Sequence, residues 1–204
     1  MKFVLFIEGH TEKKALPQFF KKWLDPRLAK PVGIKTVRFE GWQELVKDAP
    51  KKALMHLNGS EQRDVIAVIA LIDLYGPTFY PADKQTSKDR YDWAKAHLEK
   101  KVNHSKFRQF FAVHETEAWL LSNPELFPAE IKKALHTIAQ HPETINFDEH
   151  PAKLLNRLYK GAYKKVTHGS ELFSKLDPTL AYKKCPRLKE LFDEMLKLAK
   201  DADL

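Results

Sequence analysis

Along the first 122 residues, segments with the apolar pattern of a strand are followed by segments with the apolar pattern of a helix, as in an α/β protein. Unbroken apolar runs of strand length occur at residues 3–7 and 65–72, the second within a strand predicted at residues 65–73. A strand that is apolar on both faces is typical of a buried parallel sheet. Two further strands are predicted at residues 34–39 and 107–113. Helical spacing of apolar residues follows the strands, at residues 12–24, 42–57 and 87–102. We expect Pro50 to break or kink the second of these helices.

The strand signal ends near residue 122, and the remaining segments have helical spacing. Helices are predicted at residues 131–139, 151–159, 171–176 and 187–198. The expected fold class is therefore α/β, with a four-stranded, mainly parallel sheet flanked by helices in residues 1–122. Residues 123–204 form a helical C-terminal extension packed on this core, because short helices bury little surface on their own.

Composition narrows the class of protein further. The single cysteine, Cys185, excludes a disulfide framework and a Cys-rich metal site, and we expect it to be a buried structural residue. The longest apolar run, residues 65–72, is far shorter than the roughly 20 residues of a membrane helix. The apolar stretch at the N-terminus is too short for a signal peptide. We expect a soluble, cytoplasmic protein with no membrane partner.

The net charge of +8 is unevenly distributed. Residues 1–60 carry 12 basic and 6 acidic side chains, residues 61–122 carry 9 of each, and residues 151–189 carry 10 basic and 2 acidic ones. Two basic zones around a neutral middle favour a polyanionic partner such as DNA or RNA. A general solubility charge explains the same numbers, so the charge alone leaves both interpretations open.

Acidic residues follow three of the predicted strands. Glu8, Asp73 and Glu115 each stand at a strand end, and ligands of open α/β sheets bind beyond the carboxyl ends of the strands. Three carboxylates at one edge, in a chain without a cysteine cluster, predict a site for Mg²⁺ or Mn²⁺. With a bound ion, Glu8 and Asp73 are the candidate catalytic residues, and Glu8 is the best placed to act as general acid or base.

Neighbouring residues are candidates for supporting roles. Glu12, His114 and Glu117 stand close to the three acids in sequence and are expected around the metal ligands. Gly9 allows a tight turn, and the helix that begins near Thr11 directs free N–H groups toward a bound phosphate. Each acid taken singly is also explained as a helix cap or a solvated turn, and Glu12 suits a helix N-terminus.

Several enzyme classes are excluded by missing motifs. The chain has neither a Walker A sequence nor GxGxxG, so we expect neither an ATPase nor a dinucleotide-dependent enzyme. It also lacks the GxSxG motif of serine hydrolases. The nine histidines show no ligand spacing, and His114 is the one that lies beside the predicted site.

The motifs resemble those of a known family. Residues 8–12, EGHTE, resemble the EGxTE signature that opens TOPRIM-like domains, and Asp73 matches the acidic strand end of that fold. Residues 114–119, HETEAW, resemble the HExEAxL motif of the uncharacterised prokaryotic family named domain of unknown function 4276. Later landmarks of that family are similar to residues 142–146, 151–155, 159–169 and 185–186.

This resemblance implies a TOPRIM-like fold and a Mg²⁺-dependent nuclease of a prokaryotic defence or mobile-element system that works with a partner ATPase. Lys153 then supplies a cation for phosphate. The chain departs from the DxD pattern of such domains because Tyr75 stands at the second acidic position. Either Glu115 or Glu117 substitutes for the missing acid, or the metal binds weakly. A non-catalytic module that binds nucleic acid or a partner protein remains the alternative, as does a subunit that is active only with the ATPase.

Overall fold

The computed structural model describes residues 1–144 and 149–204. The strands are β1 (Lys2–Ile7), β2 (Gly33–Arg38), β3 (Val65–Asp73) and β4 (Phe107–Ala112). In the described residues they form one four-stranded sheet in the order β2-β1-β3-β4, and every neighbouring pair is parallel. The expected α/β class is confirmed, and this arrangement of strands and helices is consistent with a TOPRIM-like fold.

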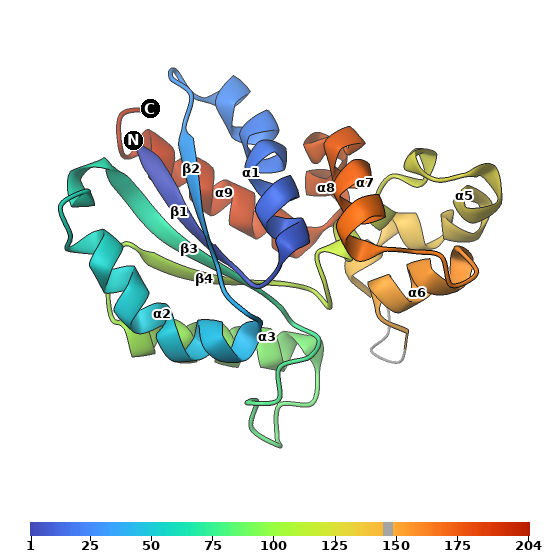
Figure 1. Ribbon diagram of the computed structural model, residues 1–204, viewed down its shortest axis with the longest axis horizontal. Helices are drawn as coiled ribbons and strands as arrows, with labels where there is room; N and C mark the ends of the chain where they lie inside the picture. Colours follow the sequence, from blue (N-terminus) through green and yellow to red (C-terminus); the bar gives the residue numbers. More distant parts are fainter. Residues whose placement is uncertain (145–148) are drawn as a thin grey trace.

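The helices lie on both faces of this sheet and beyond its carboxyl edge (Figure 1). In the first part of the chain they are α1 (His10–Leu24), α2 (Trp42–Leu57), α3 (Ser87–Val102) and α4 (Glu117–Leu121). In the second part they are α5 (Ala129–Leu135), α6 (Pro151–Leu158), α7 (Ser170–Lys175), α8 (Pro178–Lys184) and α9 (Pro186–Lys200).

Alternate residues of the strands enter two separate cores. From β1, Phe3 and Leu5 join a cluster with α1 and α9, whereas Val4 and Phe6 join a cluster with α2 and α3. The alternation follows from the twofold side-chain period of a strand. Figure 1 shows α1 and α9 on one side of the sheet and α2 and α3 on the other. The carboxyl ends of the strands point toward the part of the molecule that holds α6 (Figure 1).

Of the break or kink predicted at Pro50, the break is wrong, because α2 runs without interruption from Trp42 to Leu57. A proline has no N–H to donate to the carbonyl four residues earlier, which here belongs to Val46. The ammonium of Lys101, on the adjacent α3, donates to that carbonyl oxygen at 2.9 Å. A side chain from a neighbouring helix thus provides the hydrogen bond that the proline removes.

Candidate functional site

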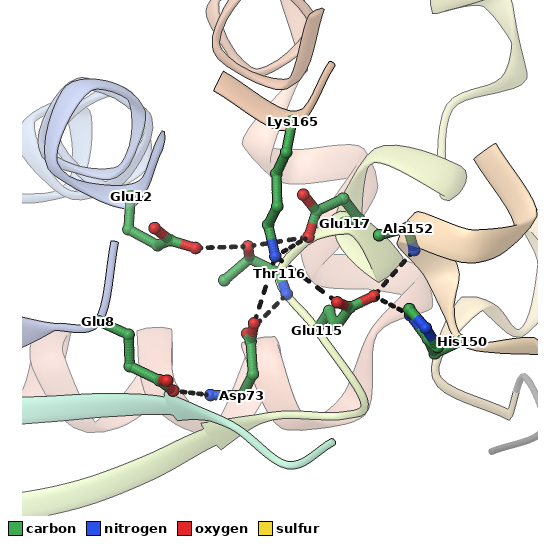
Figure 2. Close-up of polar contacts among 9 residues, drawn as sticks. All are labelled: Glu8, Glu12, Asp73, Glu115, Thr116, Glu117, His150, Ala152 and Lys165. Carbon is green, nitrogen blue, oxygen red and sulfur yellow. Dashed lines mark hydrogen bonds and ion pairs between the residues drawn. The ribbon is translucent and has the colours of Figure 1, made fainter. Parts of the chain in front are cut away.

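The two central strands bring Glu8 and Asp73 together. Glu8 follows the last residue of β1, Asp73 is the last residue of β3, and these strands are neighbours in the sheet. The backbone N–H of Asp73 donates to Oε1 of Glu8 at 2.7 Å (Figure 2). The sheet register therefore fixes the orientation of the Glu8 side chain.

A left-handed residue after β4 turns the chain back toward these acids. His114 has a φ of +56°, which is uncommon for a residue with a side chain, and its carbonyl oxygen accepts from the N–H of Tyr75 at 2.9 Å. Two residues later, the N–H of Thr116 donates to Oδ1 of Asp73 at 3.1 Å. His114 is 98% buried. Its left-handed backbone forms the turn after which Glu115 and Glu117 enter the site.

Helix α1 contributes Glu12, which is almost fully buried. The hydroxyl of Thr116 lies 3.5 Å from a carboxylate oxygen of Glu12 and 3.5 Å from one of Glu117. The expected reason for a glycine at position 9 is wrong, because Gly9 has extended backbone angles that any residue adopts. An added Cβ at this position would overlap the Glu12 carboxylate and force that side chain to move. Thr11 is buried, and its methyl group lies near Gly169.

The ammonium of Lys165 lies among the carboxylates (Figure 2). Its Nζ is 3.0 Å from Oε2 of Glu117, 3.4 Å from Oδ2 of Asp73 and 3.6 Å from Oε1 of Glu115. We name Glu8, Glu12, Asp73, Glu115 and Glu117 the carboxylate cluster. Lys165 is the residue on which three of its members converge, and the sequence did not single it out.

A second residue that the sequence missed is His150. Its Nδ1 is 2.7 Å from Oε2 of Glu115, and the same oxygen accepts from the N–H of Ala152 at 2.8 Å. The expectation that His114 is the histidine beside the site is incomplete, since His150 contacts a cluster carboxylate directly. Tyr75 stacks on the His150 ring with the centroids 4.2 Å apart, and 39% of Tyr75 is exposed.

Burial shifts the protonation of the cluster. It raises the pKa of Glu8 to about 7, against the lowering effect of the Asp73 N–H, and it also raises the pKa of Asp73. Burial raises the pKa of Glu117 to about 7, while Lys165 lowers it. For Lys165, burial lowers the pKa, but the carboxylates of Asp73, Glu117 and Glu115 outweigh it and raise the pKa overall. One ammonium thus faces several buried carboxyl groups, and the raised pKa values mean that their full negative charge is disfavoured in the metal-free protein.

The donor set suits a hard divalent cation. All five cluster side chains offer carboxylate oxygens, the ligands that Mg²⁺ and Mn²⁺ prefer. Oε1 of Glu117 is buried and has no hydrogen-bond partner among the described residues, which leaves an acceptor available. As the side chains stand, the part of the chain that the structure describes has no three His, Cys, Asp or Glu residues spaced to hold a metal. The Lys165 ammonium lies where their oxygens converge.

The remaining candidate, Lys153, lies at the edge of the site. It is an exposed residue in the first turn of α6, next to Ala152, whose N–H binds Glu115. Its phosphate-binding role stays a prediction. Of the family landmark at residues 142–146, the last two residues, Ile145 and Asn146, lie outside the described residues.

Comparisons with known proteins give a family but no function. No curated protein matches the chain, and no solved structure matches it. No helix in residues 1–144 or 149–204 combines the length and apolar character needed to cross a membrane. The model of one family, described as domain of unknown function (DUF4276), matches residues 7–196. The resemblance to this family is thereby confirmed, and the chain belongs to the DUF4276 family.

Proposed function

We propose that the protein is a Mg²⁺- or Mn²⁺-dependent nuclease that hydrolyses phosphodiester bonds at the carboxylate cluster. The observation that carries this proposal is the convergence of acids from three strand ends and α1 at one edge of a parallel sheet. Ligands of open α/β sheets bind at such an edge. We also propose, on the basis of the motif resemblance, that the nuclease works with a partner ATPase in a defence or mobile-element system.

Within this proposal, Asp73, Glu115 and Glu117 hold the ion together with Glu8. A bound divalent ion would polarise the scissile phosphate and stabilise charge on the attacking and leaving oxygens. In the metal-free protein, burial raises the pKa of Glu8 to about 7, and a carboxyl group that titrates near neutral pH is suited to exchange a proton with water or with a leaving oxygen. The Asp73 N–H holds the Glu8 carboxylate in place for that transfer.

Features around the cluster support nucleic acid as the substrate. The Tyr75 ring is exposed and stacked on His150, which in turn contacts Glu115. An exposed aromatic ring offers a stacking surface for a base. The basic stretch at residues 151–189 includes Lys153 beside the site and attracts the phosphate backbone.

The test is cleavage of labelled single-stranded DNA, double-stranded DNA and RNA by the full chain, with Mg²⁺, with Mn²⁺ and with EDTA. Glu8→Gln and Asp73→Asn keep the side-chain shape and remove charge, and we expect each to reduce cleavage by at least about 100-fold, the usual contribution of an acid–base group. Asp83→Asn and Glu171→Gln, at exposed ion pairs, are the matched controls. Undiminished cleavage by both cluster variants would contradict the proposal.

A binding module without catalytic activity is the second candidate, because Lys165 gives the cluster an ion-paired state that needs no metal. Its signature is salt-dependent binding to nucleic acid that EDTA does not change, without turnover. In that case Tyr75→Ala is expected to weaken the binding of a single-stranded oligonucleotide about tenfold through loss of stacking. Tyr75→Phe keeps the ring and should retain the affinity.

A further inference from the structure

Lys165 lies where a metal ion bound by the cluster would have to lie. Its ammonium contacts one oxygen each of Asp73, Glu115 and Glu117, three of the residues that the proposed function assigns to the ion. Mg²⁺ lies about 2.0–2.1 Å from its oxygen ligands, so it requires the centre of the same group of oxygens. An ammonium and a divalent ion repel each other and do not share that position.

The ammonium is held loosely for a charge-assisted contact. Such N–H···O⁻ bonds are typically about 2.7–2.9 Å long, and the three contacts of Lys165 measure 3.0, 3.4 and 3.6 Å. About a third of the Lys165 side chain is exposed. A flexible four-carbon stem lets the ammonium swing by several ångströms without movement of the backbone. Lys165 is therefore able to leave the carboxylates toward solvent.

The segment that carries Lys165 also has unmatched polar groups. Residues Lys165–Gly169 form a single π-helical turn, an unusual conformation that is frequent at functional sites. The hydroxyls of Tyr163 and Ser170, on either side of this turn, are buried without a hydrogen-bond partner among the described residues, as is Oε1 of Glu117. Unpaired buried polar atoms cost free energy. Polar groups on both sides of the turn that carries Lys165 are thus open to a further hydrogen-bond partner.

We propose that Lys165 is a displaceable counter-ion: it neutralises the carboxylate cluster in the metal-free protein, gives up its position to a divalent ion, and then binds the phosphate of the substrate. This inference rests on the proposed function, because it assumes that the cluster takes a metal. It predicts that the Lys165 ammonium and the divalent ion compete for the carboxylate cluster. Removal of the ammonium should strengthen metal binding and weaken the binding of nucleic acid.

The experiment measures Mn²⁺ binding to the full chain, stripped with EDTA and dialysed, by titration calorimetry and by the electron paramagnetic resonance signal of free Mn²⁺. Lys165→Met keeps most of the stem and removes the charge. We expect it to bind Mn²⁺ on the order of tenfold more tightly than the unaltered protein, because no ammonium has to be displaced. In the presence of Mn²⁺ we expect it to bind a labelled oligonucleotide less tightly. Lys200→Met, at an exposed lysine at the end of α9 and outside both basic zones, is the matched control and should change neither.

The outcomes separate the two proposals. Suppose that Mn²⁺ binds to the unaltered protein and that Asp73→Asn abolishes this binding. If Lys165→Met then leaves the Mn²⁺ affinity unchanged or lowers it, the inference about Lys165 is overturned, whereas the proposed metal site stands. If neither the unaltered protein nor Lys165→Met binds Mn²⁺ at millimolar concentration, the metal-dependent function falls, and the inference falls with it.

A second measurement on the unaltered protein does not depend on the folding of a variant. Lysines are acetylated with and without saturating Mn²⁺, and the modified peptides are counted by mass spectrometry. Displacement predicts that Mn²⁺ increases the labelling of Lys165 relative to Lys164 several-fold. An unchanged ratio with Mn²⁺ bound overturns the inference.

Discussion

Glu143 shows that burial also controls the charge of an acid outside the carboxylate cluster. Its carboxylate accepts the backbone N–H groups of Arg187 and Leu188, at 2.8 and 3.3 Å. These are N–H groups of the first turn of α9, which has no partner for them within the helix. Burial nevertheless raises the pKa of Glu143 to about 7, while these N–H groups lower it. Glu143 thus caps α9 at the cost of a disfavoured negative charge.

This shift predicts how stability depends on pH. Between about pH 4.5 and 7 the folded chain binds more protons at Glu143 than the unfolded chain does, so the free energy of unfolding falls as the pH rises through that window. Glu8 and Glu117 act in the same direction. Glu143→Gln should remove about 1–3 kcal/mol of the decrease between pH 5 and 8. Urea unfolding at several pH values measures it.

The matched control is Glu130→Gln, at an exposed residue of α5, which should leave the pH dependence unchanged. If Glu143→Gln and the unaltered protein lose the same stability between pH 5 and 8, then the Glu143 charge is not disfavoured in the folded state.

Some site residues were predicted from the sequence alone and others were not. Glu8, Asp73 and Glu115 were found because parallel strands end at a common edge, and the structure places them there. Lys165 and His150 were missed because both lie outside regular strands and α-helices, where spacing carries no signal. The family landmark at residues 159–169 contains Lys165, but a lysine among many lysines does not reveal which acids it meets.

At the scale of the elements, α2 depends on a contact with α3. Pro50 removes one hydrogen bond within α2, and Lys101 donates to the carbonyl oxygen of Val46 in its place. Helix α8, in contrast, was not predicted from the sequence. Few of its residues are buried, Pro178 and Ala181 among them, so it lacks the apolar periodicity that revealed the longer helices.

The α2–α3 contact gives a double-mutant prediction. Lys101→Met should cost about 1 kcal/mol of unfolding free energy, a typical net value for one hydrogen bond. In a Pro50→Ala background the restored N–H of residue 50 satisfies the Val46 carbonyl, and the same Lys101→Met change should then cost little. Urea unfolding of the four proteins measures this coupling. Equal costs in both backgrounds would show that the Lys101 contact does not compensate for the proline.

For the whole molecule, the last helix is part of the main core. Phe192 of α9 is fully buried and stacks with Trp23 of α1, with the ring centroids 4.6 Å apart. Residues from β1, β3 and β4 belong to the same apolar cluster. The boundary at residue 122 stays a prediction, but a chain cut there would expose the face of the sheet that α9 covers.

We therefore expect residues 1–122 and 123–204 to unfold together. Phe192→Ala should lower the free energy of unfolding by about 3–5 kcal/mol, as is usual for a large aromatic side chain removed from a core. Tryptophan fluorescence and far-ultraviolet circular dichroism should then report one coincident transition. The control, Val166→Ala at an exposed position, should have little effect. Two separate transitions would show that the extension is an independent unit.

The order in which the site residues occur in the chain has a consequence for protein synthesis. All five cluster carboxylates lie between residues 8 and 117, whereas the lysine that pairs with three of them is residue 165. Because translation proceeds from the N-terminus, the acids leave the ribosome well before their lysine. The nascent chain thus presents these carboxylates to the cations of its surroundings before it has an ammonium of its own to place among them.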